Sequence, residues 1–278
     1  MDARLQRRVQ RYGWDRAVDA YARHWLGPLA GLQAEVLVCA APRAGERVVD
    51  LACGTGVLAL AAARAMGATG HVLGVDLSDA MVREAQRRAQ DEGLAHAAFA
   101  PMDAERLSLP AASIDLALCS LGLMYLPDPD AALRELHRVL RPGGRAVLAV
   151  WGARAHCGWA PVFGIVDDVV RSEVCPLFFA LGQPDALARR CASVGLCVTA
   201  QHRRSDTLVY ADGDAACDAA FVGGPVALAW SRFDAQTRVR VRARYRDAIA
   251  PFARGSSYHL PAEFVIVTVQ RPQHGDAL

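Results

Sequence analysis

Short apolar runs alternate with longer amphipathic stretches between about residue 46 and residue 152. The short runs end in turn residues and predict buried strands in RVVDLA, HVLGVDL, the weaker AAFAPMD, IDLALCSLG and RAVLAVWG. The longer stretches each stop at glycine or proline–glycine and predict helices at 57–66, 78–93 and 128–141. Strands that alternate with helices imply right-handed crossovers and a parallel sheet, so we expect an α/β, doubly wound fold.

The rhythm of the pattern changes after Trp151. The rest of the chain predicts helices at 158–174 and 184–195, a sixth strand in LCVTAQHRR, a mainly helical stretch over 212–253 and a last strand in AEFVIVTVQR. The first 40 residues also have a helical pattern and precede the sheet. Helical segments are therefore expected before the sheet and between its later strands.

The segment TRVRVRARYR, residues 237–246, fits two patterns. Its strict alternation is typical of a strand. However, Val241, Tyr245 and Ile249 fall at helical spacing, and Asp234 is a suitable N-cap. We favour a helix, whose arginines either recognise an anionic part of a ligand or form a solvated face.

Composition narrows the possible functions. A hydrophobic fraction of 53% suits a large core, and a net charge of +2 is too small to indicate a nucleic-acid partner. The chain has no lysine, which excludes a Schiff-base lysine and a P-loop lysine, and its eight cysteines form no C-x-x-C pair, so we expect no metal. The charged N-terminus does not resemble a signal peptide, and no apolar run is long enough to cross a membrane. A cytoplasmic protein without a membrane partner is the expectation.

The stretch VVDLACGTG, residues 48–56, is the first candidate for a binding site. Its glycines follow a predicted strand and precede a predicted helix, at the edge where parallel sheets bind ligands. Asp76 ends the second strand, in the usual place for an acid that accepts hydrogen bonds from ribose hydroxyls. Asp50, directly before the turn, would repel a pyrophosphate and attract a cation. The pattern therefore favours a nucleoside that carries positive charge.

VVDLACGTG together with GVDLS resembles motifs I and II of the class I S-adenosylmethionine (SAM)-dependent methyltransferases. The resemblance continues from APMDAERLSLP through LCSLGLMYLPDPDAALRELHRVLRPGGRAVLAVWG, and is greatest to the small-molecule branch of ubiquinone/menaquinone biosynthesis C-methyltransferases. It covers about residues 40–152, and the last third resembles other members more weakly. It implies a Rossmann-like sheet of seven mostly parallel strands with the last one antiparallel. It also implies an N-terminal helical lid over 1–40 and a SAM-binding core over 41–278, with helical insertions at about 153–182 and 212–253.

The resemblance also implies a set of cofactor contacts. The methionine part of SAM would lie near Asp50, Ala52, Gly54 and Gly56. The ribose would bind Asp76, and Leu77 and Met81 would flank the nucleoside. The adenine amino group would bind Asp103 beside Met102, and the ammonium group would lie near Ser120.

The implied reaction is an in-line transfer of methyl from SAM to a small, largely apolar acceptor, with S-adenosylhomocysteine (SAH) as product. Oxygen or carbon acceptors are favoured and sulfur stays open, whereas the absence of a D/N-P-P-Y tetrapeptide disfavours amino groups and nucleobases. Candidates for a general base are His24, Tyr125, His156 and His259. Candidates for the acceptor wall are Trp14, Tyr21, Trp25, Met124, Tyr125, Trp151, Trp159 and Phe163.

Two other functions stay open at this point. An NAD(P)-linked oxidoreductase is disfavoured by Asp50 and by the absence of any lysine for a Y-x-x-x-K pair. A non-catalytic SAM-binding protein is disfavoured by the intact glycine motif and the aromatic residues. The partner is expected to be a small molecule rather than a nucleic acid, and the chain is expected to be a monomer or a homodimer.

Overall fold

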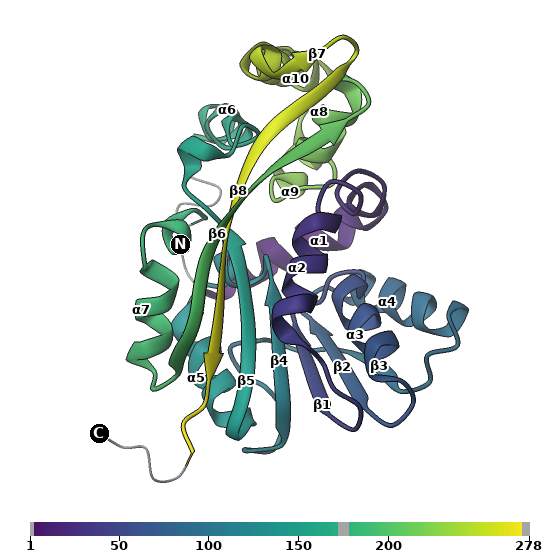
Figure 1. Cartoon of the computed structure of the whole chain (residues 1–278). Helices are drawn as coiled ribbons and strands as arrows, with labels where there is room; N and C mark the ends of the chain where they lie inside the picture. The colour runs from purple at the N-terminus through teal and green to yellow at the C-terminus, as the bar shows by residue number, and fades with distance from the viewer. Residues whose placement is uncertain (1–2, 172–177, 274–278) are drawn as a thin grey trace.

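One sheet organises the computed structural model of the chain, which describes residues 3–171 and 178–273. Its strands lie in the order β3-β2-β1-β4-β5-β8-β6, and a short β7 pairs with β8 (Figure 1). Their bounds are β1 (Arg47–Leu51), β2 (His71–Asp76), β3 (Ala97–Pro101), β4 (Ile114–Ser120), β5 (Leu140–Trp151), β6 (Cys197–Tyr210), β7 (Ala253–Arg254) and β8 (Ser257–Gln270). Strand β8 is antiparallel to β5 and β6, while β1 to β5 pair in parallel, so the expected doubly wound sheet with an antiparallel last strand is confirmed.

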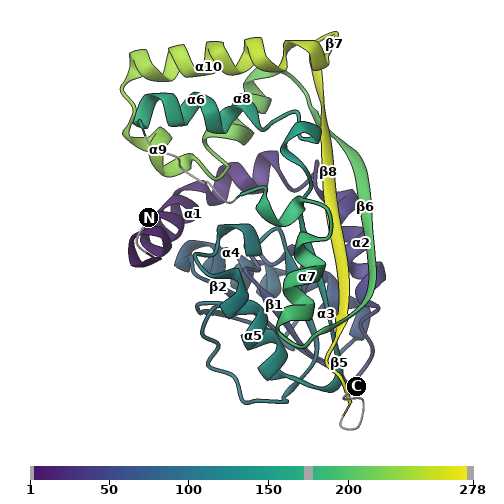
Figure 2. The same cartoon turned by 90° about the vertical axis from the view of Figure 1, so that its left-hand side faces the viewer.

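Helices cover both faces of this sheet. They are α1 (Ala3–His24), α2 (Ala30–Ala40), α3 (Val57–Met66), α4 (Asp79–Asp91), α5 (Pro129–Val139), α6 (Pro161–Val170), α7 (Ala186–Ser193), α8 (Gly213–Phe221), α9 (Ala227–Arg232) and α10 (Ala235–Ile249), with 3₁₀ turns η1 (Leu123–Tyr125), η2 (Arg154–His156), η3 (Ala180–Gly182) and η4 (Ala250–Phe252). Helices α2 and α3 pack on one face, and α5 and α7 on the other (Figure 2). In the described residues, no helix is both long enough and apolar enough to span a bilayer.

Strands β6 and β8 are longer than the sequence pattern predicted. They pair from Cys197 opposite Gln270 up to Tyr210 opposite Tyr258, and their upper halves rise above the sheet toward α8 and α10 (Figure 1). The upper half of β6 does not show the alternation of apolar and polar residues that predicts a strand, because its inward positions include charged residues. Arg204, one of them, is covered by α2 through its ion pair with Glu35.

The segment with two possible patterns is the helix α10, as favoured. Asp234 accepts a hydrogen bond from the Thr237 amide at 2.7 Å and caps the helix. Val241, Tyr245 and Ile249 are fully buried on one face. A strand would have placed the arginines, which stand at every second position, together on one face, whereas the helix distributes them around the sides away from the buried face.

Two predicted helices have different bounds in the structure. The helix predicted over 128–141 ends at Val139, because Leu140 already pairs with Ile114 in the sheet and Pro142 disfavours helix before it. The helix predicted over 158–174 is α6, which begins at Pro161, and part of the predicted range lies outside the described residues.

Candidate functional site

A cavity lies at the carboxyl ends of β1, β2 and β4, beneath α1 and beside the turn between α8 and α9. Of the ten predicted cofactor residues, all but Asp50 and Gly56 line it; they are Ala52, Gly54, Asp76, Leu77, Met81, Met102, Asp103 and Ser120. The structure adds neighbours that were not predicted: Arg7, Gln10, Arg11, Ser78, Ala104, Leu121 and Gly122. Three of these residues, Arg7, Gln10 and Arg11, belong to α1, and no local sequence motif predicts that α1 lines the cavity.

The two glycines of the CGTG turn have different roles. Both have a left-handed backbone, with φ of +54° at Gly54 and +79° at Gly56. Gly54 lines the cavity, and its amide donates to Asp76 Oδ2 at 2.9 Å. At Gly56 a Cβ atom would lie 2.9 Å from Ala85 Cβ and from Phe99 Cε1. Gly56 does not line the cavity itself, and its backbone lets α3 begin close to α4 and β3. Its contact with a cofactor stays a prediction.

Asp50 also does not line the cavity, and its place beside a cofactor stays a prediction. It is 2% exposed, and its Oδ2 has no hydrogen-bond partner among the described residues. Burial raises the pKa of this carboxyl to about 8, and the nearby charge of Asp76 contributes to the rise. Near neutral pH this carboxyl therefore holds its proton, and a cation nearby would favour its ionised form.

Asp76 lies at the end of β2, where it organises the cofactor end of the cavity. Its Oδ2 accepts from the Gly54 amide and its Oδ1 accepts from the Ser78 amide at 2.8 Å. Burial raises the pKa of Asp76 above its ordinary value. Ser78 caps α4 and donates to Asp15 of α1 at 2.6 Å, which fixes α1 over the same end.

Asp103 follows β3 and is held on both oxygens. Oδ2 lies 2.9 Å from Arg7 Nε of α1, and Oδ1 accepts from the Glu105 amide at 2.9 Å. Arg7 also pairs with Glu105. Helix α1 is therefore tied to the loop that carries Asp103 by an ion-pair cluster at the cavity mouth.

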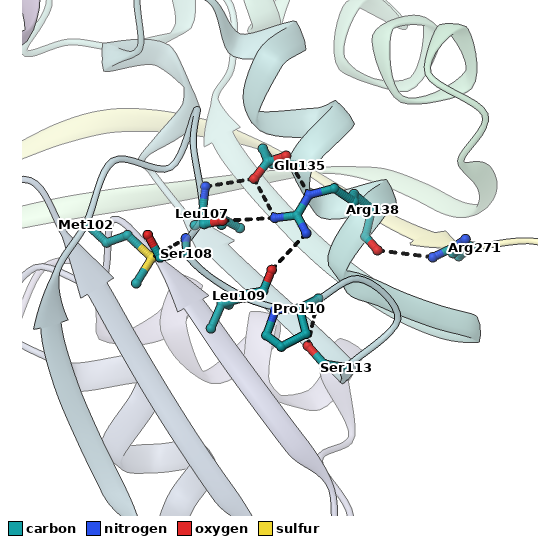
Figure 3. Close-up of polar contacts among 9 residues, drawn as sticks. All are labelled: Met102, Leu107, Ser108, Leu109, Pro110, Ser113, Glu135, Arg138 and Arg271. Carbon is teal, nitrogen blue, oxygen red and sulfur yellow. Dashed lines mark hydrogen bonds and ion pairs between the residues drawn. The ribbon is translucent and has the colours of Figure 1, made fainter.

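Arg138 of α5 binds the same loop, as Figure 3 shows. Its guanidinium donates to the carbonyls of Leu109 at 2.8 Å and Leu107 at 2.9 Å, and pairs with Glu135. Glu135 in turn accepts from the Leu107 amide at 2.7 Å. Sequence reasoning missed this pair, although the spacing of Glu135 and Arg138 by three residues on a helix was a possible signal.

Aromatic side chains form the opposite end of the cavity. The predicted residues that line it are Trp14, Tyr21, Trp25, Tyr125, Trp151 and Trp159. Met124, also predicted there, is a buried core residue behind Tyr125, and Phe163 packs on Trp159 at a centroid distance of 5.5 Å without lining the cavity. Phe178 joins the two sides of the cluster, because it contacts Tyr125 at 5.3 Å and Trp159 at 5.6 Å. No motif marks Phe178 in the sequence.

Tyr21 connects the two ends of the cavity. It contacts Trp14 edge-on at 5.7 Å. Burial, together with the charges of Asp76 and Asp50, raises the pKa of its hydroxyl to about 12. The Tyr21 hydroxyl therefore keeps its proton near neutral pH and acts as a donor rather than a base.

Of the four candidate bases, only Tyr125 lines the cavity. His156 Nδ1 lies 2.8 Å from Glu263 Oε1, His259 pairs with Ser257 on β8, and His24 ends α1. The structure does not bring these three imidazoles to the cavity. Within residues 3–171 and 178–273 there is also no cluster of three or more acidic, histidine or cysteine residues that suits a metal ion.

The arginines of α10 are largely engaged in ion pairs. Arg242 pairs with Asp214 and Asp218 of α8 at 2.6 Å each, and Arg244 pairs with Asp168 of α6 at 2.6 Å. Helix α10 thus joins two helices above the cavity and does not line it. The arginines of α10 were expected either to recognise an anionic part of a ligand or to form a solvated face. Because none of them lines this cavity, they do not contact a ligand there.

Residues 48–144 match the family described as methyltransferase domain. This stretch is similar to methyltransferase domains. It runs from β1 through β4 to the start of β5, and these strands carry the cofactor end of the cavity. The resemblance drawn from VVDLACGTG and GVDLS is therefore confirmed for this part of the chain.

Two curated relatives of the matched stretch have names that refer to small molecules. Aklanonic acid methyltransferase DauC of Streptomyces sp. (strain C5) is 39% identical over 104 residues, which are 37% of this chain and 47% of DauC. Ubiquinone/menaquinone biosynthesis C-methyltransferase UbiE of Pseudomonas putida strain F1 is 40% identical over 107 residues, which are 38% of this chain and 42% of UbiE. The matched stretch thus spans less than half the length of these relatives.

The fold extends beyond the methyltransferase domain. Geranyl diphosphate C-methyltransferase from Streptomyces coelicolor A3(2), solved with Mg²⁺, geranyl diphosphate and SAH, superposes with a TM-score of 0.53 and 20% identity. The superposition covers 88% of this chain and 82% of that enzyme. At this identity the likeness establishes a shared fold.

Proposed function

We propose that the chain is a SAM-dependent methyltransferase that acts on a small, largely apolar acceptor by in-line displacement. One observation carries the proposal: a single cavity joins the strand ends of the methyltransferase domain to an aromatic chamber. When bound, SAM supplies a methyl group already activated by its sulfonium, so the protein needs chiefly to orient the reactants and exclude water.

The residues at the cofactor end suit SAM. Asp76 and Asp103 already accept backbone or arginine N–H groups, and each carboxylate oxygen keeps a second lone pair. Asp76 would accept from the ribose hydroxyls and Asp103 from the adenine amino group. Ser120 lines the cavity with a buried Oγ that has no partner among the described residues, and it would meet the ammonium group. A cationic ligand would in turn favour ionisation of the buried acid Asp50, whose pKa is raised to about 8 by burial.

The acceptor chamber supports an apolar substrate. Its wall is made of indole and phenol rings, which bury apolar area and leave few polar groups to solvate a charged ligand. The names of DauC and UbiE refer to aklanonic acid and to ubiquinone and menaquinone biosynthesis, which is consistent with small-molecule acceptors. Transfer to oxygen or carbon is the favoured chemistry.

Calorimetry with SAM, SAH and NADH tests the cofactor. Wild type should bind SAM and SAH, and Asp76→Asn should weaken SAM binding about 10- to 100-fold, because ribose loses a charged acceptor. Asp91→Asn, at the far end of α4, is the matched control and should change nothing. Tight binding of NADH without SAM would instead identify an oxidoreductase.

Turnover tests the second part of the proposal. A panel of phenols, quinols, enols and thiols is incubated with SAM, and release of SAH is measured. SAH release with at least one panel member is the expected result. Tight SAM binding with no release across the panel would indicate a SAM-binding protein that is not an enzyme.

A further inference from the structure

Trp159 lies at the centre of the aromatic chamber. It follows η2 and precedes α6, it is 1% exposed, and it lines the cavity. Its ring contacts Trp151 at 4.8 Å, Trp25 at 5.4 Å and Phe178 at 5.6 Å. The ring is therefore held in place from several sides.

The indole N–H of Trp159 has no hydrogen-bond acceptor among the described residues. The rings packed around it carry donors or no polar atom at all, so they do not satisfy it. A buried N–H without an acceptor is costly, and native structures rarely leave one in place without a reason. Because Trp159 also lines the cavity, a ligand in the chamber is the available source of an acceptor atom.

Trp25 provides an internal comparison in the same cluster. Its indole N–H donates to the carbonyl of Ala219 in α8 at 2.9 Å. This chain therefore satisfies a buried indole where a backbone carbonyl is near. The hydroxyls of Tyr210 and Tyr245 also lack partners, but neither residue lines the cavity, so neither bears on a ligand there.

The rest of the described wall limits what else could hold a polar group of the acceptor. Its ionisable side chains are Arg7, Arg11, Tyr21, Asp76, Asp103 and Tyr125. Both arginines pair with acids at the cavity mouth, and both acids belong to the cofactor end. Among the rings of this wall, Trp159 thus supplies a buried neutral donor without an acceptor among the described residues.

We propose that the indole N–H of Trp159 binds an oxygen of the methyl acceptor, so that the acceptor is an apolar, flat molecule with a carbonyl, enolate or phenolate oxygen. That the ligand is a methyl acceptor rests on the proposed function, whereas the binding of its oxygen by Trp159 does not. Trp159 is then a specificity-determining residue, which selects oxygen-bearing ligands from hydrocarbons of the same shape and sets the orientation of the ring.

Two probes of nearly equal shape test the assignment: 2-acetylnaphthalene and 2-isopropenylnaphthalene. They differ in one position, where a carbonyl oxygen replaces a methylene group. Calorimetry with the SAH-loaded protein should show about 3- to 10-fold tighter binding of the ketone by wild type. Trp159→Phe should bind both probes equally. Trp230→Phe, the matched control, changes an indole that does not line the cavity and should keep the preference.

A measurement on the unaltered chain covers the case in which Trp159→Phe does not fold. In protein labelled with ¹⁵N-tryptophan, one indole N–H signal should shift downfield with the ketone and not with the hydrocarbon. Equal affinity of wild type for both probes, binding of neither probe, or no such shift would overturn the assignment. If wild type did not bind SAM but still bound 2-acetylnaphthalene more tightly than 2-isopropenylnaphthalene, the proposed function would be overturned. The assignment of Trp159 would then remain valid.

Discussion

The two ends of the cavity are assembled from the chain in different ways. At the cofactor end, Ala52, Gly54, Asp76 and Ser120 follow the ends of three adjacent strands within the methyltransferase domain. At the acceptor end, the rings come from α1, η1, the end of β5 and the segment before α6. The first end is fixed by the sheet itself, and the second by packing between segments that are distant in sequence.

This difference predicts different consequences of mutation. A change at the cofactor end should act through backbone geometry and charge, and its effect should be large. A change among the helices above the acceptor end should act through side-chain contacts, and its effect should be small.

The largest effect is expected for Gly56→Ala. The new Cβ combines a left-handed backbone with contacts of 2.9 Å to Ala85 and Phe99, so about 2–5 kcal/mol of the free energy of unfolding should be lost. Urea unfolding measures this loss.

Gly54→Ala is the matched control for that change. Its φ is also positive, but a Cβ there meets no atom within 4 Å and would enter the cavity. It should cost about 1–2 kcal/mol of stability and weaken SAM binding more than Gly56→Ala does in the fraction that remains folded. Equal stability losses in the two variants would contradict the separate roles assigned to these glycines.

The same contrast explains what the sequence could predict. The strands β1 to β5, the glycine turn and the acids Asp76 and Asp103 were predictable because each depends on a local pattern and on the edge where parallel strands end. Phe178, the contribution of Arg7 and the bonds from Arg138 to the carbonyls of Leu107 and Leu109 were not, because these partners lie far along the chain. Asp50 shows a further limit: its position in the motif indicated its charge preference, but its complete burial depends on neighbouring elements.

A pH-dependent effect is expected for Asp50→Asn. The folded pKa of Asp50 is about 8, whereas an unfolded aspartate has a pKa near ~3.9. Between these values the folded state holds a proton that the unfolded state has released. This group therefore removes stability as pH rises through the window, by at most ~1.4 kcal/mol per pH unit. The Tm of Asp50→Asn relative to wild type should increase steadily from pH 5 to pH 8.

Glu84→Gln is the control, because the pKa of Glu84 is lowered in the folded state whereas that of Asp50 is raised. Hydrogen bonds from Arg87 lower the pKa of Glu84 to about 2, so any stability it contributes is fully present above pH 5. The Tm difference between this variant and wild type should stay constant from pH 5 to pH 8. If Asp50→Asn behaved in the same constant way, the buried carboxyl would be ionised throughout, and its unpartnered oxygen would need another explanation.

The smallest effect is expected at the acceptor end, for Arg242→Gln. Arg242 joins α10 to α8 through Asp214 and Asp218, whose side chains are 66% and 39% exposed, so water and salt already screen both pairs. The loss should be about 0.5–1 kcal/mol of stability. Because α8 leads into the Gly224–Pro225 turn of the cavity wall, binding of 2-acetylnaphthalene should weaken by less than about 3-fold while SAM binding is unchanged.

At 1 M NaCl the differences between Arg242→Gln and wild type in stability and in 2-acetylnaphthalene binding should both disappear. A loss of stability that persists in high salt would show that packing, not ion pairing, holds α10 on α8, and a loss of SAM affinity would show that the two ends of the cavity are coupled.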